Sequence, residues 1–180
     1  MTDPHGPWSK GTLTGQGALT VEEIRRQGLE AETRARDYIR TTPLEPSTWL
    51  SRLGACDVYL KLENLQTTGS FKLRGAANRL LTLTSGERAN GVVTASTGNH
   101  GSAVAYLLRA LGWPGTVYVP ETISAAKLGA LERLEANLEL HGDDGVEAEI
   151  RARHGRKTAF WAYVNGTRRD RHDDADDPAA

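Results

Sequence analysis

The chain has 180 residues, of which 38% are hydrophobic, so it is long enough for one domain with a core and a little short for two. Its formal net charge of −1, with 25% charged residues, offers no basic face to nucleic acid and no polybasic patch to a membrane. One cysteine excludes an intrachain disulfide, and no apolar run approaches the roughly 20 residues that cross a bilayer. We therefore expect a cytoplasmic protein whose partner is a small molecule.

Three regions follow one another along the chain. Residues 1–18 are rich in glycine, threonine and polar residues, and we expect them to form a disordered leader. Residues 19–154 carry the periodic patterns of a folded region. From residue 155 a brief aromatic cluster precedes a run of arginine and aspartate with no apolar face. We expect residues 155–180 to be a disordered tail that adds nothing to a sheet.

The folded region alternates helical and strand patterns. Thr20 and Glu23 form a capping box, and apolar residues then recur at helical spacing until "TTPLEP" ends the pattern. The further helices expected are 47–54, 71–84, 101–112, 124–136 and 143–154, and the strands are 56–63, 91–96, 115–120 and 137–142. This alternation predicts an α/β fold, a doubly wound parallel sheet with helices on both faces. Ligands bind such sheets at the carboxyl ends of the strands.

The turn after strand 91–96 leads into a helix through small and polar residues. Such a turn presents backbone N–H groups and the positive end of the helix dipole, which together bind an anion such as a carboxylate or a phosphate. Ser96, Thr97, Asn99 and His100 add side-chain donors. The alternative is an ordinary capped turn, with Ser96 or Thr97 as the cap and His100 satisfied at the surface.

A lysine occupies a second helix start, in "TTGSFKLRG". With Ser70 as the N-cap, Lys72 falls in the first helical turn, where the dipole disfavours a cation and helps to hold the amine neutral. A neutral amine condenses with an aldehyde to form a Schiff base, and the usual protein-bound aldehyde is pyridoxal phosphate. The alternative is a solvated lysine after a common Gly-Ser turn.

The two turns together resemble the fold type II family of pyridoxal-phosphate enzymes, in particular its threonine and serine dehydratase and serine racemase branch. The resemblance rests on "KLENLQTTGSFKLRGAANRL" followed by "TASTGNHGSAVAYLLRALG", with "TPLEPSTWLS" before them and "VYVPETISAAKLGALERL" after. It runs from near Thr20 to about Arg153. The resemblance therefore implies the N-terminal part of the family fold, including its small domain, truncated before most of the larger domain.

The resemblance implies a role for each matching residue. Lys72 matches the Schiff-base lysine, which also moves the substrate's α-proton, and Phe71 matches the residue that packs near the cofactor. Asn99 matches the side chain that hydrogen-bonds the cofactor's ring hydroxyl. The loop that holds the substrate carboxylate is matched by Ser96, Thr97, Gly98, Asn99 and His100. Thr97 stands where racemising relatives carry a serine and several dehydratases carry alanine. The resemblance thus makes Lys72 and Thr97 the candidate catalytic residues.

The activity implied is β-elimination from a hydroxy amino acid, threonine or serine, to a keto acid and ammonia, with pyridoxal 5'-phosphate as cofactor. Racemase activity is neither supported nor excluded, because Thr97 keeps a hydroxyl but adds a methyl group. A similar "STGNHG" loop also occurs in dehydratase-like proteins of hydroxyectoine utilisation. The family's glycine-rich phosphate loop and the residue opposite the pyridine nitrogen have no counterpart in this sequence. We therefore expect little turnover by this chain alone.

Three classes of function stay open. The first is an active lyase, alone or completed by a second polypeptide, and the second is an inactive truncated relative that self-associates through unburied apolar surface. The third is a nucleotide-binding doubly wound domain. This class has the weakest support, because the first strand-to-helix turn lacks the motif G-x-G-x-x-G and the sequence contains no G-x-x-x-x-G-K-[ST] motif. The histidines outside the loop have no metal-like spacing, so we name no metal ligand.

Overall fold

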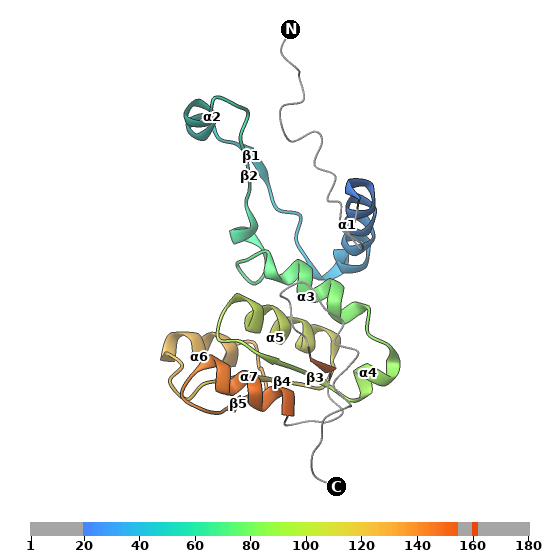
Figure 1. Cartoon of the computed structure of the whole chain (residues 1–180), viewed down its shortest axis with the longest axis vertical. Coiled ribbons are helices and arrows are strands. Elements are labelled where there is room, and N and C mark those ends of the chain that lie inside the picture. The colour runs from blue at the N-terminus through green and yellow to red at the C-terminus, as the bar shows by residue number, and fades with distance from the viewer. Residues whose placement is uncertain (1–19, 155–159, 162–180) are drawn as a thin grey trace.

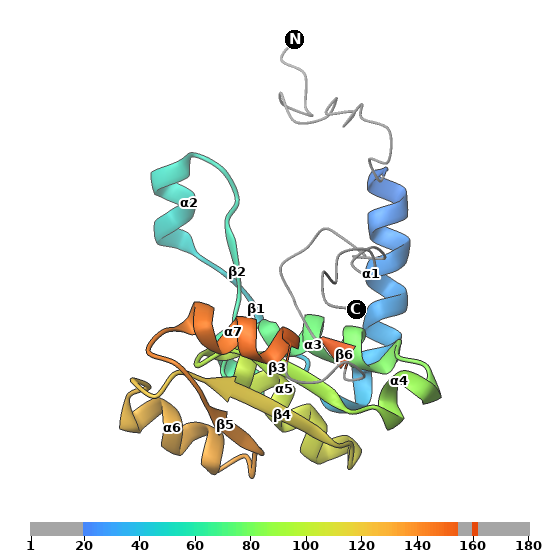
Figure 2. The same ribbon diagram turned by 60° about the horizontal axis from the view of Figure 1, so that its bottom comes forward.

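A computed structural model describes residues 20–154 and 160–161, and its main body is a parallel sheet with helices on both faces (Figures 1 and 2). The sheet has the strand order β5-β4-β3-β6. Its strands are β3 (Val92–Ala95), β4 (Gly115–Val119), β5 (Leu138–Leu140) and β6 (Phe160–Trp161). All three pairings are parallel, which confirms the predicted sheet.

The helices follow the predicted pattern, mostly with shorter bounds, although α5 begins two residues before the predicted start at residue 101. They are α1 (Val21–Ala35), α2 (Thr48–Gly54), α3 (Lys72–Leu81), α5 (Asn99–Leu111), α6 (Ala125–Glu132) and α7 (Gly145–His154). The structure also contains α4 (Ser85–Ala89) and the 3₁₀ turns η1 (Arg36–Tyr38) and η2 (Glu63–Leu65), which were not predicted from the sequence. Thr20 Oγ1 accepts a hydrogen bond from the Glu23 amide at 3.1 Å, so the expected N-cap of α1 is present. None of the helices in the described part of the chain is long and apolar enough to cross a membrane.

The two faces of the sheet are covered by different helices. One cluster joins α5, α6 and β4 and contains Ala105, Val117, Val119 and Leu131. The opposite cluster joins α7 to the sheet and contains Val93, Tyr118, Ala148 and Ala152. Because the side chains of successive strand residues point to opposite faces of the sheet, Val117 packs in the first cluster and Tyr118 in the second.

The path of the chain reverses beside β3. From β3 the chain passes through α5 to β4 and through α6 to β5, with both helices on one face. It then crosses the other face through α7 to reach β6, which pairs with the free side of β3. The topological switch point therefore lies between β3 and β6, and the carboxyl end of β3 is where such a fold binds its ligand.

Strand β6 corrects one prediction. Residues 155–180 were expected to add nothing to the sheet, yet Phe160 and Trp161 pair in parallel with Val92 and Val93. Two aromatic residues with high strand propensity suffice for a short edge strand, whereas the charged run after them dominates the local composition. The expected leader and the rest of the expected tail lie outside the described residues. The division into 1–18, 19–154 and 155–180 stays a prediction.

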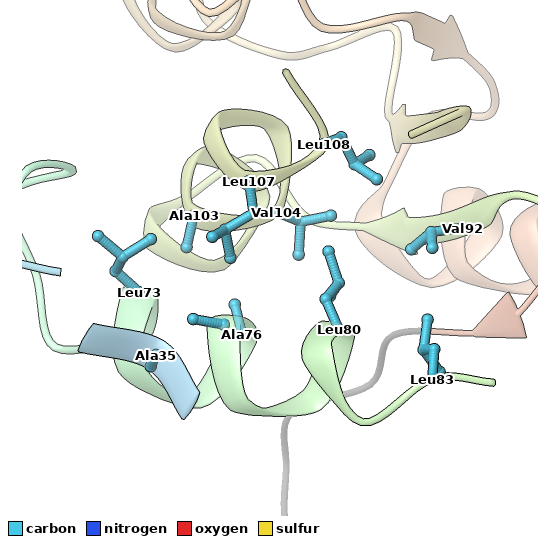
Figure 3. Close-up of a cluster of buried hydrophobic side chains, with 11 residues drawn as sticks. Ala35, Leu73, Ala76, Leu80, Leu83, Val92, Ala103, Val104, Leu107 and Leu108 are labelled. Carbon is cyan, nitrogen blue, oxygen red and sulfur yellow. The ribbon is translucent and has the colours of Figure 1, made fainter. Parts of the chain in front are cut away.

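The largest core cluster lies between α3 and α5 (Figure 3). Leu73, Ala76, Ala77 and Leu80 recur at the spacing of one helical face, and all four are fully buried. In Figure 3 Leu73 lies beside Ala103, near the start of α5, while Leu80 lies toward Leu108, near its end. The two helices therefore run in the same direction, and their amino ends lie at the same end of the molecule.

Strands β1 (Leu44–Pro46) and β2 (Tyr59–Lys61) form an antiparallel pair that, with α2, extends from the body as an arm (Figures 1 and 2). The expected strand 56–63 is reduced to β2 and lies outside the parallel sheet, because its residues pair antiparallel with β1. The "TTPLEP" segment, expected only to end a helix, supplies β1.

Candidate functional site

The loop after β3 opens onto the amino end of α5. The helix begins at Asn99, and Gly98 precedes it without any side-chain cap. Ser96 Oγ instead accepts a hydrogen bond from the Gly98 amide at 3.3 Å, within the loop. The alternative in which Ser96 or Thr97 caps the helix is therefore wrong. No side chain makes an N-cap hydrogen bond at the positive end of the α5 dipole, which suits this end to an anionic group.

Gly101 lets this loop fold back onto α5. A Cβ atom built on Gly101 would lie 2.2 Å from the Ser96 carbonyl oxygen and 3.1 Å from its carbonyl carbon. Backbone cannot yield at such distances as a flexible side chain can, so only glycine allows this approach. This role of Gly101 could not be predicted from the sequence, because the contact with Ser96 forms only when the loop is folded.

Substituting Gly101 by alanine is expected to displace the Ser96–Gly98 loop and to destabilise the protein by at least about 1 kcal/mol, the usual cost of overpacking. The control is Gly28→Ala in α1, where no atom lies within 4 Å of the added Cβ. This control is expected to gain about 0.5–1 kcal/mol from helix propensity. Urea unfolding measures both variants, and a Gly101→Ala protein as stable as the unsubstituted chain would contradict the proposed loop packing.

Lys72 is the first residue of α3, as expected for a lysine in the first helical turn. The N-cap position is held by Phe71, with no side-chain cap, so the prediction that Ser70 is the N-cap is wrong. The chain turns one residue later than the pattern suggested, which takes the Ser70 side chain inward. Ser70 is only 6% exposed, and its hydroxyl has no hydrogen-bond partner among the described residues. The Thr68 hydroxyl is buried in the same way.

The Lys72 amine lies over the ring of its neighbour. Lys72 Nζ is 5.3 Å from the centroid of Phe71, within the range of a cation–π contact, and Phe71 itself is 61% exposed. Phe71 therefore packs beside Lys72 but presents most of its surface to the outside.

A bidentate ion pair fixes the segment that leads into α3. Arg74 donates from Nε and Nη2 to the Glu63 carboxylate at 2.9 and 2.8 Å, and Thr42 Oγ1 donates to the same carboxylate at 2.6 Å. The Arg74 hydrogen bonds lower the pKa of Glu63 from 4.5 to about 2. The pair joins η2 to α3 two residues after Lys72, and it was not singled out from the sequence.

Gln66 ties the same segment to the chain before β1. Its side chain is buried, its amide nitrogen donates to the Arg40 carbonyl at 2.9 Å, and its amide oxygen accepts from the Arg40 backbone N–H at 2.7 Å. The same oxygen accepts from the Thr67 amide at 3.1 Å. Gln66 and the Glu63–Arg74 pair thus hold both ends of the turn that carries Lys72.

The structure brings the predicted residues to one end of the molecule without joining them in one cavity. Lys72 begins α3 and the Ser96–His100 loop leads into α5, so both lie at the amino ends of two helices that run in the same direction. A cavity of about 280 Å³ at the carboxyl ends of β3 and β4 is lined by Ser96 and Thr97 and reaches Gly145 of α7. Lys72, Phe71, Asn99 and His100 do not line it.

A larger cavity, of about 500 Å³, lies at the opposite edge of the sheet. Gly115 at the start of β4 and Trp113 before it contribute to its wall, and it contains none of the predicted site residues. The carboxyl edge remains the candidate site because the uncapped helix end, the switch point and the lysine turn are all found there.

Comparison with known proteins places these features in a family. The family described as "Pyridoxal-phosphate dependent enzyme" matches residues 35–172. A putative threonine dehydratase of Sinorhizobium fredii is 39% identical over 132 residues, which are 73% of this chain and 39% of that protein. An L-threonine ammonia-lyase of Thermotoga maritima is 38% identical over 136 residues, 74% of this chain and 33% of that protein. The chain spans between a third and two fifths of these relatives' length.

Solved structures agree with the sequence comparisons. Maize serine racemase superposes with a TM-score of 0.70 at 27% identity, covering 77% of this chain and 43% of that one. The processed form of threonine deaminase isoform 2 from Solanum lycopersicum gives a TM-score of 0.71 at 28% identity, covering 81% and 41%. The fold and the family resemblance predicted from the sequence are confirmed.

Proposed function

Because the chain belongs to the family of pyridoxal-phosphate dependent enzymes, we propose that it is the lysine-bearing part of an ammonia-lyase that acts on threonine or serine. The observation that carries this proposal is the placement of Lys72 at the start of α3, at the same end of the molecule as the uncapped amino end of α5. One turn offers an amine for an aldehyde, and the other offers a helix end for a carboxylate.

The described residues fit pyridoxal phosphate at the lysine turn. The Lys72 amine can bond an aldehyde, and two buried hydroxyls without partners among the described residues, those of Thr68 and Ser70, lie just before it. Unpartnered buried hydroxyls cost free energy, so such a turn favours a ligand or a further protein segment that supplies hydrogen bonds. The glycine-rich loop that holds the phosphate in the family has no counterpart here and is expected on another segment.

Each matching residue has a proposed task. When bound, pyridoxal phosphate supplies an electron-poor ring that accepts electrons from the substrate's α-carbon. Lys72 Nζ would hold the cofactor through its aldehyde group, and the same amine would take the substrate's α-proton. Phe71 packs beside the cofactor, and the Asn99 side chain hydrogen-bonds its ring hydroxyl. The substrate carboxylate is bound by Ser96, Thr97, Gly98, Asn99 and His100.

Thr97 supports a second candidate reaction. Thr97 lines the 280 Å³ cavity beside Ser96, where its hydroxyl could exchange a proton with the substrate. A racemase would need such a group on the face of the substrate opposite Lys72. Formation of the D-enantiomer from L-serine distinguishes this reaction from ammonia release, and a Thr97→Ala variant that lost only the former would assign Thr97 to it.

The partners and location are part of the same proposal. The substrate is an amino acid, the enzyme works in the cytoplasm, and the active form contains a second polypeptide or further copies of this chain. More than half of each relative lies outside the region that matches this chain.

Keto-acid release tests the proposed function. The 180-residue chain alone is expected to release negligible keto acid and ammonia from L-threonine or L-serine. The cofactor phosphate is then unanchored, and misplacement by about 1 Å can cost roughly a hundredfold in rate. Adding the remainder of the Sinorhizobium fredii relative as a separate polypeptide is expected to produce activity that Lys72→Ala abolishes. Activity that persists in Lys72→Ala would contradict the proposal.

A further inference from the structure

The cavity of about 500 Å³ at the amino edge of the sheet has the size and the lining of a small-molecule site. It lies between the last turn of α5, the start of β4 and the turn that leads from α6 to β5. Its apolar wall is formed by Ala105, Leu108, Trp113, Pro114, Val117 and Ala136. Pockets for small ligands are typically about 300–1,000 Å³, mainly apolar, with a few polar groups that orient the ligand.

The apolar wall is held in place by packing. A Cβ atom built on Gly115 would lie 2.7 Å from the Val92 carbonyl oxygen and 2.5 Å from Leu108 Cδ1, so glycine allows this close approach of α5 to the sheet. Trp113 packs against the core cluster between α3 and α5, and the Arg88 guanidinium lies 5.2 Å from its ring centroid. A ligand that enters the cavity therefore meets a wall that is already formed, which lowers the entropic cost of binding.

Two opposite charges line the same cavity. Arg109 Nη2, in the last turn of α5, lies 2.9 Å from Glu135 Oε1, in the turn after α6. The two side chains are 52% and 68% exposed. Ion pairs this exposed contribute little to stability, so little free energy is lost when they turn to another partner. The pair is therefore suited to a ligand that carries both an anionic and a cationic group.

The backbone at Glu135 indicates that its carboxylate is needed. Glu135 has a φ of +56°, in the left-handed region that glycine and asparagine occupy at less cost. The turn itself uses only backbone groups there, because the Glu135 amide donates to the Glu132 carbonyl at 2.8 Å. Glycine would supply the same hydrogen bond without the strain. Strained residues of this kind cluster at ligand sites, where the side chain has a task.

We propose that this cavity binds a free α-amino acid with a large apolar side chain. The ligand carboxylate pairs with Arg109 and its ammonium group with Glu135, while its side chain packs against Leu108 and Trp113. The two charges of an α-amino acid are joined through one carbon atom, so they match a protein pair whose own charged atoms lie 2.9 Å apart. Binding here does not depend on pyridoxal phosphate, since neither Lys72 nor the Ser96–His100 loop lines the cavity.

The test titrates the whole chain with L-phenylalanine and with L-leucine, followed by calorimetry and by amide NMR spectra. Saturable binding is expected, with shifts at Trp113 and Asn137 of the cavity. Phenylpropionate lacks the ammonium group and phenethylamine lacks the carboxylate, so each is expected to bind at least about tenfold more weakly than L-phenylalanine.

Variants of the charged pair test its role in binding. Arg109→Gln and Glu135→Gln are each expected to weaken the binding of L-phenylalanine at least about tenfold. The matched control is Arg151→Gln, which breaks another exposed pair, Arg151–Glu139 at 3.2 Å, outside the cavity. This control is expected to change the affinity less than twofold.

Glu135→Gly separates binding from folding. Because glycine removes the strain at the positive φ, this variant is expected to unfold at the same urea concentration as the unsubstituted chain or at a higher one, yet to lose the ligand. Three results would overturn the proposed site: no saturable binding of either amino acid, shifts confined to the Ser96–His100 loop, or unchanged affinity in both Arg109→Gln and Glu135→Gln. The first of these would leave retention of pyridoxal phosphate at Lys72 unaffected, so the proposed function is judged separately.

Discussion

Replacing Lys72 by alanine is expected to eliminate the pyridoxal phosphate that the chain retains after borohydride reduction. Reduction converts the link between an amine and the aldehyde into a stable bond, so only cofactor attached to a lysine survives denaturation. If Lys72 is the attachment point, the Lys72→Ala chain should retain less than about a tenth of the unsubstituted level. The retained cofactor is measured by absorbance after unfolding and removal of free ligand.

Lys127→Ala is the matched control for this experiment. Lys127 lies on α6 and is exposed, so its amine reacts with free aldehyde as any surface lysine does. Its removal is expected to leave specific retention unchanged. Equal retention by the Lys72→Ala and unsubstituted chains would show that the aldehyde binds elsewhere and would remove the main support for the proposed lyase.

Acid is expected to destabilise the protein through Glu63. The folded-state pKa of Glu63 is lowered from 4.5 to about 2, chiefly by Arg74. A lowered carboxyl pKa contributes stability that is fully present above about pH 4.5 and is lost as the pH falls toward about 2. The lowered pKa of Glu63 corresponds to a contribution of about 3 kcal/mol to the free energy of unfolding. Since the Glu63 and Arg74 side chains are 15% and 32% exposed, solvent screening reduces this contribution to about 2 kcal/mol.

Glu63→Gln isolates this contribution. The variant should lose about 2–3 kcal/mol of unfolding free energy at pH 7, since it leaves the Arg74 guanidinium without its carboxylate. Between pH 4.5 and pH 2 its stability should fall less steeply than that of the unsubstituted chain. Glu121→Gln, at an exposed position, is the control. Parallel stability curves for Glu63→Gln and the unsubstituted chain in this range would contradict the role assigned to the pair.

The elements that sequence alone predicted are those whose pattern is local. The spacing of Leu73, Ala76 and Leu80 defines one helical face, and the apolar run "GVV" between turn residues defines β3. Strand β1 could not be predicted, because Pro43 and Pro46 read as a helix stop and only pairing with β2 reveals a strand. Strand β6 was missed for a similar reason, since two residues carry no period.

Some residues of the candidate site could likewise be predicted from local sequence, whereas others could be found only in the folded structure. Lys72 and the Ser96–His100 loop were found from the sequence because their chemistry is carried by adjacent residues. Arg74 and Glu63 are eleven residues apart, and only the fold of η2 against α3 brings them together. The Ser70 prediction failed because a serine before a helix suggests a cap, whereas burial of its side chain depends on how the turn packs.

Mapping the lysine that retains pyridoxal phosphate tests the assignment of Lys72 most directly. The unsubstituted chain is incubated with the cofactor, reduced with borohydride, digested and analysed by mass spectrometry. The modification is expected on Lys72, in the segment that begins α3. Modification of Lys61 or Lys127, with Lys72 left unmodified, would contradict the assignment.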